Sequence, residues 1–563
     1  MPAYSLALTL LVTAPLLAPG YLLLRDAVST PRSYLSDAAL GLSEAAPRAL
    51  PQDFAVALGS WAFGGAVVVK ALLIGGLWLA GWGAAKLVGV VLPAAGLPGQ
   101  FVAVTLASWN PYVAERLLQG HWSLLVGYGC LPWVAAAVLR LRAGDGSFWP
   151  LVCWIALAGL TPTGLLLAAT VALVCTAAPG AGRPRWACAA FSLGVAVLTA
   201  LPWLLASVLA GSLSSTQATG VSDFAARAEP GLGTLGSLAG LGGIWNSQAV
   251  PDSRTTLFAL VGTAVLLTVV AIGLPTALRC PTAVPLLVLA AVAVVCPALT
   301  ATGPGMAALE ALVRAWPGLG VLRDGQKWVA LAMPGYVLAG ASAVMTLRAR
   351  VSPPVTAACC CVALLAVLPD LAWGVGGQVG SVRYPPGWTA VAAAVNADPR
   401  PVAVLPPDSM RQFGWAGTAP VLDPLPRWVS AEVLTTGDLN IGGRTVPGEG
   451  KRARAVQQLL LSGARASELA AAGVGWVVVE SGRGSMPLAP LALPVAYHDD
   501  QLTLYRVGGD HPAAAQRHVM IAAHLGWLGT LAVGACGTLV GAIRSRRRPR
   551  APGTPSALEA SGY

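Results

Sequence analysis

The segment WNPYVAERLLQGHW, residues 109–122, lies between two long apolar runs at residues 87–107 and 123–140. Each run approaches the roughly 20 apolar residues with which an α-helix crosses a bilayer. The hydrogen-bonding and charged members of the segment are Asn110, Glu115, Arg116, Gln119 and His121. Spanning helices joined by such a polar connection predict a mainly α-helical, polytopic integral membrane protein.

The composition supports this fold class and bears on the partners. Of the 563 residues, 56% are hydrophobic and 10% are charged, and the mean hydropathy is +0.68. The basic residues behind the net charge of +11 lie in short loops and in the tail RSRRRPR, residues 544–550. This distribution is typical of the cytoplasmic side of a membrane protein rather than of a nucleic-acid-binding face. We therefore expect the lipid bilayer as a partner and no nucleic acid.

The apolar runs predict about twelve membrane spans. They cover residues 4–24, 61–82, 87–107, 123–140, 149–160, 164–177, 187–208, 256–276, 281–302, 328–347, 354–374 and 518–543. Basic residues occupy alternate loops, whereas the long loops between them carry most of the acidic residues. This asymmetry predicts a multi-pass protein of the plasma membrane with both termini cytoplasmic and the long loops outside.

Two of these assignments have alternatives. Residues 4–24 share features with a signal peptide, but they lack a basic leading region and their apolar stretch is long, which favours a retained first span. Residues 149–177 form either one long kinked helix or two short helices that meet at residues 161–164. Arginines in loops 140–145 and 178–186 favour two helices, because both loops then face the cytoplasm.

One late segment differs from the rest of the chain. Residues 375–517 are too polar to span a membrane, and they hold strand-like runs at 402–407, 476–481 and 502–507 and an amphipathic helix near 450–472. This pattern predicts a small extracytoplasmic α/β domain before the last span. The expected organisation is a transmembrane domain at 1–374, the α/β domain at 375–517, the last transmembrane helix at 518–543 and a basic cytoplasmic tail at 544–563.

The polar segment has a local helix signal and two interpretations. Asn110 followed by Pro111 is a helix start, and the helix is expected to end near Leu118 because Gly120 follows. One interpretation is an interfacial helix at the outer surface, anchored by aromatic residues, with Glu115 paired to an arginine. The other is a polar cavity between spans, since ionisable groups at a membrane are costly unless they are paired or used.

Two further outer loops favour the cavity. Residues 22–35 place Arg25 and Asp26 directly after the first span, and residues 321–331 place Arg323, Asp324 and Lys327 at the mouth of another. A carboxylate can accept the proton of a sugar hydroxyl as the oxygen attacks. Arginine and lysine can hold a phosphate. A sugar-transfer reaction with a lipid-phosphate donor needs both kinds of group, and these loops carry both.

At these residues the chain resembles the GT-C superfamily of multi-spanning glycosyltransferases, which use polyprenyl-phosphate sugars. The likeness is to actinobacterial membrane proteins related to the cell-wall arabinofuranosyltransferases and to the YfhO-type glycosyltransferases. It rests on LRDAV at 24–28, on the 109–122 segment, on the PTG break at 162–164, on LRDGQKW at 322–328 and on the late α/β segment.

The resemblance implies roles for individual residues. Asp26 becomes the expected catalytic base, with Asp53 as second choice and Glu115 as a further candidate. The expected donor-phosphate and substrate-binding residues are Arg25, Asn110, Arg116, His121, Arg323, Asp324 and Lys327. The first loop lacks an Asp-Asp or Asp-x-Asp pair. Because an isolated carboxylate is a poor divalent-cation site, neither a metal nor another cofactor is expected.

The function that follows is transfer of a sugar from a polyprenyl-phosphate donor to an envelope glycan or lipid acceptor, on the extracytoplasmic face. Two alternatives remain at this point. One is a non-catalytic GT-C-like scaffold of envelope synthesis, and the other is a transporter or flippase of a lipid-linked substrate, for which polar residues near the bilayer midplane and inverted repeats are expected.

Overall fold

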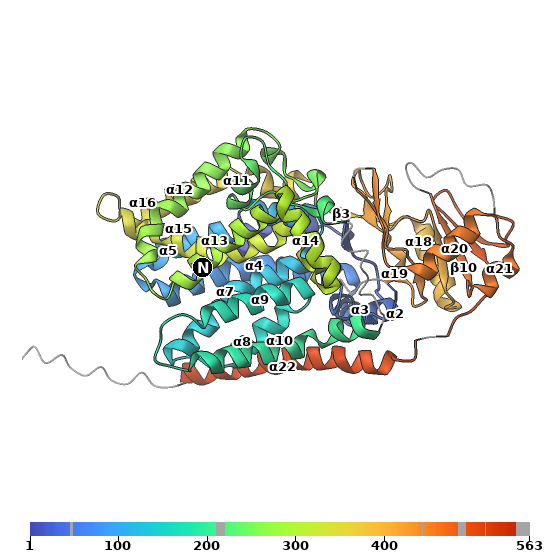
Figure 1. Cartoon of the computed structure of the whole chain (residues 1–563), viewed down its shortest axis with the longest axis horizontal. Coiled ribbons are helices and arrows are strands. Elements are labelled where there is room, and N and C mark those ends of the chain that lie inside the picture. The colour runs from blue at the N-terminus through green and yellow to red at the C-terminus, as the bar shows by residue number, and fades with distance from the viewer. Residues whose placement is uncertain (45–48, 210–219, 442, 482–490, 513, 548–563) are drawn as a thin grey trace, which may run out of the picture.

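The computed structural model is elongated, with a helical bundle at one end and a sheet-containing segment at the other (Figure 1). It describes residues 1–44, 49–209, 220–441, 443–481, 491–512 and 514–547. Residues 548–563 of the predicted tail therefore lie outside the described residues. The last helix, α22 (Arg517–Arg547), returns from the sheet-containing segment and runs along the bundle beside α8 and α10.

The chain is a multi-pass membrane protein, but twelve spans are not confirmed. In the described residues, six helices are long and apolar enough to cross a bilayer, and eight if two bent pairs each count as one span. The six are α4 (Gly65–Val91), α7 (Trp122–Ala143), α10 (Arg185–Leu209), α12 (Phe258–Leu278), the Gly325–Leu347 unit of η8 and α15, and α22. The bent pairs are α13 (Val284–Thr300) with α14 (Gly303–Ala315), and α16 (Pro353–Ala366) with the Pro369–Gly376 helices.

The first predicted span is shorter than expected. Helix α1 (Pro2–Thr13) and η1 (Ala14–Leu17) stop before Pro19, and residues Tyr21–Leu24 form strand β1. Proline removes a helical hydrogen bond, and Gly20 takes a φ of 128°, so the helix cannot continue. Strand β1 pairs with β2 (Ala27–Val28) and with β3 (Ser381–Val382). Arg25 and Asp26 thus lie in a hairpin turn and not at the mouth of a helix.

The bundle is centred on the deeply buried helix α7. It packs against α4, α8 (Trp149–Ala158) and α9 (Pro162–Cys175). At the crossing with α4, a Cβ on Gly129 would lie 2.1 Å from the carbonyl oxygen of Gly76, so the two backbones meet directly. Two short helices, rather than one kinked helix, cover residues 149–177, and Thr161 caps the second by accepting a 3.0 Å hydrogen bond from the amide of Gly164.

The polar segment forms helix α6 (Pro111–Leu118), as its sequence predicts. The side chain of Asn110 caps it by accepting a 3.1 Å hydrogen bond from the amide of Val113. The interpretation of this helix as an interfacial one at the outer surface, however, is wrong, because every residue of α6 is buried. The short helix is enclosed by the bundle and by the loops that precede α12 and α15, which supply partners for its charged side chains.

The late segment contains a five-stranded sheet with the order β11-β12-β10-β4-β7. Strand β10 (Trp476–Glu480) runs parallel to β4 (Val402–Leu405), which runs parallel to β7 (Val433–Leu434). Strand β12 (Leu502–Arg506) is antiparallel to both β10 and β11 (Val495–His498). The three predicted strands are confirmed, whereas the predicted helix near 450–472 is two helices, α20 (Lys451–Leu461) and α21 (Ala466–Ala471).

The Asp26 hairpin connects the bundle to this sheet segment. Leu23 and Val28 belong to the same apolar core as Trp388 and Val404 of the sheet segment. A small hairpin, β5 (Met410–Arg411) with β6 (Val421–Leu422), joins through its backbone, since the amide of Leu422 donates to the carbonyl of Arg25 at 2.9 Å. Residues far apart in sequence are thereby fixed around one turn.

Candidate functional site

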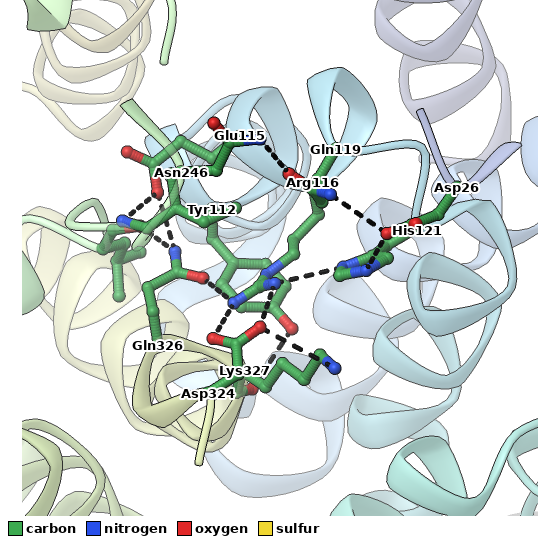
Figure 2. Close-up of polar contacts among 12 residues, drawn as sticks. Asp26, Tyr112, Glu115, Arg116, Gln119, His121, Asn246, Asp324, Gln326 and Lys327 are labelled. Atoms are coloured by element: carbon green, nitrogen blue, oxygen red, sulfur yellow. Dashed lines mark hydrogen bonds and ion pairs between the residues drawn. The ribbon is translucent and has the colours of Figure 1, made fainter. Parts of the chain in front are cut away.

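Three consecutive residues after helix α6 hold Asp26 in place (Figure 2). The amide of Asp26 donates to the carbonyl of Gln119 at 3.2 Å. Its Oδ2 atom accepts from Gln119 Nε2 at 3.0 Å and lies 2.9 Å from His121 Nε2. Gly120, between them, has a φ of 81°, and a Cβ there would lie 2.4 Å from the carbonyl oxygen of Leu24. Only glycine therefore permits this contact between the two turns.

The contacts of His121 define its protonation. Its Nδ1 lies 3.0 Å from Nη1 of Arg116. A guanidinium can only donate, so Nδ1 must accept, and the ring hydrogen lies on Nε2, toward Asp26. Burial lowers the pKa of His121, and the positive charges of Lys327 and Arg116 lower it further, against the opposing effect of Asp26. A neutral imidazole with this tautomer is the form that satisfies both neighbours.

Asp26 itself remains a carboxylate. Burial would raise its pKa, but the hydrogen bonds from His121 and Gln119 and the charge of Lys327 outweigh burial, and its pKa lies below the ordinary value. The side chain is 35% exposed. Both side-chain contacts go to Oδ2, and no described residue donates a hydrogen bond to Oδ1. One oxygen is thus held while the other is available to a ligand.

A buried ion pair lies behind His121. Arg116 donates from Nη1 and Nη2 to the two oxygens of Asp324, at 2.8 and 2.9 Å, and from Nη2 to Gln326. Burial would raise the pKa of Asp324, but the charges of Arg116 and Lys327 and this hydrogen bonding lower it well below its usual range. Lys327 Nζ lies 3.7 Å from Asp324 Oδ2. The 109–122 and 322–328 motifs therefore meet through side chains, as Figure 2 shows.

Glu115, next to Arg116 in α6, faces the loop before α12. Its oxygens accept hydrogen bonds from the amides of Gly243 and Ile244 at 3.2 and 3.1 Å and from Gln326 Nε2 at 2.9 Å. Burial and the charge of Glu229 raise the pKa of Glu115 well above its usual range. The side chain fastens the loop before α12 onto α6. Asn246 of that loop donates to Gln119 Oε1 at 2.8 Å and supports the amide that contacts Asp26.

A cavity of about 1620 Å³ opens beside this network. Its walls come from the Asp26 hairpin, from α10, from the loop before α15 and from the sheet segment. The predicted site residues that line it are Arg25, Asp26, Asp53, His121, Arg323, Asp324 and Lys327. Residues Trp203, Leu204 and Val208 of α10 add an apolar wall, and Leu204 and Val208 are exposed.

Three predicted site residues do not reach this cavity. Glu115 and Arg116 are 0% exposed, and their hydrogen-bond partners are other groups of the protein. Asn110 caps α6 and donates to Tyr128. The prediction of Glu115 as a catalytic group, and of Asn110 and Arg116 as substrate ligands, is corrected: they position α6 and its neighbours. Local spacing identified the segment but could not show which face of α6 is enclosed.

The prediction of Arg25 as a ligand of the donor phosphate is also corrected. The φ of Arg25 is 46°, and its guanidinium donates to the carbonyls of Leu118 and Gln248, with only 4% of the residue exposed. These contacts brace the hairpin turn and engage the guanidinium with protein carbonyls. Asp53 lines the cavity but pairs with Arg427 of the sheet segment, at 3.2 Å. Arg323 lies with its guanidinium carbon 4.9 Å above the ring of Phe224.

Several residues of the site had no clear signal in the sequence. Gln326 joins Glu115 to Arg116, and Asn246 reaches Gln119 from a loop more than 120 residues away. Arg427 belongs to a turn-like DPLPRW stretch that is unremarkable by itself. Only the fold brings these loops together. Among the described residues, no group of three or more His, Cys, Asp or Glu side chains is arranged to hold a metal ion.

Comparison with known proteins finds solved structures with a similar fold. No family model and no curated protein sequence matches the chain. Among solved structures, the arabinofuranosyltransferase AftD from Mycobacteria is similar over 91% of this chain, with a TM-score of 0.58 and 17% sequence identity. A mutant structure of the same protein gives a TM-score of 0.51 at 18% identity, again over 91% of this chain. The fold of this chain is therefore similar to that of part of AftD.

The likeness is limited in extent. The chain spans 40–42% of the length of the AftD chain. It agrees with the predicted likeness to arabinofuranosyltransferases at the level of the fold, and the YfhO-type resemblance is not shown.

Proposed function

We propose that the protein transfers a sugar from a polyprenyl-phosphate donor to a glycan or lipid acceptor of the cell envelope, on the extracytoplasmic face. The observation that carries the proposal is Asp26: a carboxylate held by Gln119 and His121, with one oxygen available, at the wall of a large cavity in a fold similar to that of AftD. The name of the structural neighbour, an arabinofuranosyltransferase, supports a pentofuranose as the sugar.

In the proposed reaction, Asp26 Oδ1 accepts the proton of the acceptor hydroxyl while that oxygen bonds to the anomeric carbon of the donor. The bond between the anomeric carbon and the lipid phosphate oxygen breaks, and the phosphate leaves with the electron pair. His121 and Gln119 keep Asp26 ionised and oriented. A positioned general base contributes roughly 10²–10⁴-fold to the rate.

The leaving phosphate is assigned to the cations of the cavity. Lys327 and Arg323 line it on the side of α15, and Asp324 holds Lys327 from behind. Preorganised cations stabilise the charge that develops on the leaving group, and they act more strongly where water is excluded. The apolar wall from α10 provides a surface for the polyprenyl chain, because its apolar side chains Leu204 and Val208 are exposed.

Asp26→Asn tests this proposal directly, because it keeps the shape and the contacts to Oδ2 but removes the base. We expect a deletion strain that carries this variant at normal abundance to lose nearly all of the envelope glycan product. Asp53→Asn is the matched control, since Asp53 lines the same cavity but is paired with Arg427. Full complementation by Asp26→Asn, with loss in Asp53→Asn, would move the base to Asp53.

Full complementation by both variants would favour the scaffold alternative. The transporter alternative lacks a specific observation in its favour, since the polar network gathers on the short helix α6 and at the hairpin and loop ends of the longer helices.

A further inference from the structure

A second polar cluster lines the cavity from the sheet segment. Arg411 of β5 donates from Nε to Glu480 Oε2 at 2.6 Å, and its Nη2 lies 3.9 Å from Asp423 Oδ2. The three side chains are at most 5% exposed, and all three residues line the cavity. None of them takes part in the reaction proposed for Asp26. We call Arg411, Asp423, Glu480 and the neighbouring Ser409 the sheet-edge cluster.

The sheet-edge cluster has unused hydrogen-bonding capacity. Within the described part of the chain, two of its buried polar atoms, Ser409 Oγ and Arg411 Nη1, have no hydrogen-bond partner, whereas the carboxyl groups of Asp423 and Glu480 can hydrogen-bond to each other. Leaving a buried polar atom unpaired costs free energy, so such atoms are rare in native proteins and call for an explanation. A bound ligand that both donates and accepts hydrogen bonds would satisfy them.

The position of the cluster is that of a ligand site in an open α/β sheet. Glu480 ends strand β10, and Ser409 follows the end of the parallel strand β4. Ligands of such sheets bind outside the carboxyl ends of the strands, where the connecting loops leave a crevice. Here that crevice is part of the large cavity, whose lining continues from Leu405 to Gln412.

The charge of the cluster favours a neutral ligand. Burial and the charge of Asp423 raise the pKa of Glu480 well above its usual range, and burial raises the pKa of Asp423. An anionic phosphate would meet two carboxyl groups, and a cation would meet Arg411. Sugar hydroxyls both donate and accept, and match this mixture of donors and acceptors.

Backbone hydrogen bonds also fix the position of the cluster relative to Asp26. Asp423 follows Leu422, whose amide donates to the carbonyl of Arg25 at 2.9 Å, and the amide of Arg25 donates to Pro420 at 3.0 Å. Asp423 is fixed in turn by accepting a 2.7 Å hydrogen bond from the amide of Leu425. A sugar bound at the cluster is therefore placed on the same backbone frame as the proposed base.

We propose that the sheet-edge cluster is the acceptor subsite, where Ser409, Arg411, Asp423 and Glu480 bind the hydroxyl groups of a neutral glycan and direct one hydroxyl toward Asp26. This inference rests on the proposed function for its assignment to the acceptor. The donor sugar phosphate occupies the wall of Lys327 and Arg323. Acceptor binding and donor binding thus depend on different, separable residues.

The test is the Kd of a synthetic arabinofuranose oligosaccharide for the full-length protein in lipid nanodiscs, in an Asp26→Asn background that blocks transfer. We add Ser409→Ala, Asp423→Asn or Glu480→Gln. Ser409→Ala removes a hydroxyl without a protein partner, so it leaves the existing hydrogen bonds of the cluster intact. We expect the Kd to rise about tenfold for each carboxyl variant and several-fold for Ser409→Ala, the size of one lost hydrogen bond.

The matched control is Asp398→Asn, which removes a carboxylate of the same segment that pairs with Arg400 outside the cavity lining. Its Kd should be unchanged, and binding of polyprenyl phosphate should be unchanged in every variant. An unchanged Kd in Ser409→Ala, or no binding of the oligosaccharide in the Asp26→Asn protein, would overturn the subsite. Should Asp26→Asn retain transfer activity, the proposed base is wrong, while the subsite is still decided by the Kd values.

Discussion

His121 illustrates how one residue can act on a reaction without contacting its substrate. Its Nε2–H donates to Asp26, and its other nitrogen accepts from Arg116. Arg116 is fixed by its ion pair with Asp324, so it orients the imidazole, which in turn orients the proposed base. The sequence motif indicated that His121 matters, but the tautomer and the partner on each nitrogen follow only from the structure. His121 is a positioning residue in this arrangement.

The pH dependence of transfer tests that role. The pKa of Asp26 lies below its ordinary value partly because His121 donates to it. His121→Ala removes this donor, so the pKa of Asp26 should rise and the acidic limb of the kcat–pH profile should move to higher pH. The same coupling stabilises the folded state above the unfolded pKa of Asp26 and is lost as the pH falls through the folded pKa. An acidic limb that does not move would contradict this role for His121.

Donor binding is tested at Arg323 and Lys327. Each lines the cavity, and a charged hydrogen bond to phosphate contributes about 1.5–3 kcal/mol. Arg323→Ala and Lys327→Ala should therefore each weaken binding of polyprenyl phosphate about 10–100-fold in a purified-protein binding assay. Arg314→Ala is the control, because Arg314 belongs to an exposed ion pair with Glu310 on α14. Donor affinity equal to wild type in both cavity variants would remove the phosphate role.

At the scale of elements, the close approach of the Asp26 hairpin to the end of α6 depends on Gly120. Alanine there would need a φ of 81° and would place its Cβ 2.4 Å from two backbone atoms of the hairpin. We expect Gly120→Ala to displace Asp26 and reduce transfer at least tenfold, since small misplacements of catalytic groups are costly. Gly194→Ala in α10, where a Cβ meets nothing within 4 Å, should keep full activity.

The measurement for this pair is transfer activity together with the thermal melting temperature. Normal activity of Gly120→Ala would show that the hairpin tolerates a shift and that the contact is not needed to place Asp26.

The elements that could be predicted from sequence are those with strong local signals. Asn110-Pro111 defines the start of α6, and Thr161-Pro162 defines the start of α9. The predicted span at 4–24 failed because apolar residues 21–24 suit a buried strand as well as a helix, and strand β3, their partner, lies about 360 residues later. Likewise, the enclosure of Glu115 depends on the loop at Gly243–Ile244, which no local pattern connects to α6.

At the scale of the whole molecule, the proposed reaction requires the sheet segment to lie outside the cytoplasm. The cavity has walls from both the bundle and the sheet segment, so the two must be on the same side of the membrane as the Asp26 hairpin. The basic loops and tail predict that this side is extracytoplasmic, with both termini inside. The orientation is a prediction from charge alone, and it can be tested independently of any activity.

Ser462→Cys offers that test, because Ser462 is exposed between α20 and α21. The exposed native cysteines, Cys296, Cys359 and Cys536, would first be replaced by alanine. We expect a membrane-impermeant thiol reagent to label the introduced cysteine in intact cells. Arg348→Cys, between α15 and α16, is the matched control and should be labelled only after the cells are opened. Protection of Ser462→Cys in intact cells, with labelling of Arg348→Cys, would invert the topology. The cavity would then face the cytoplasm, and a soluble nucleotide-sugar donor would have to replace the lipid-linked one.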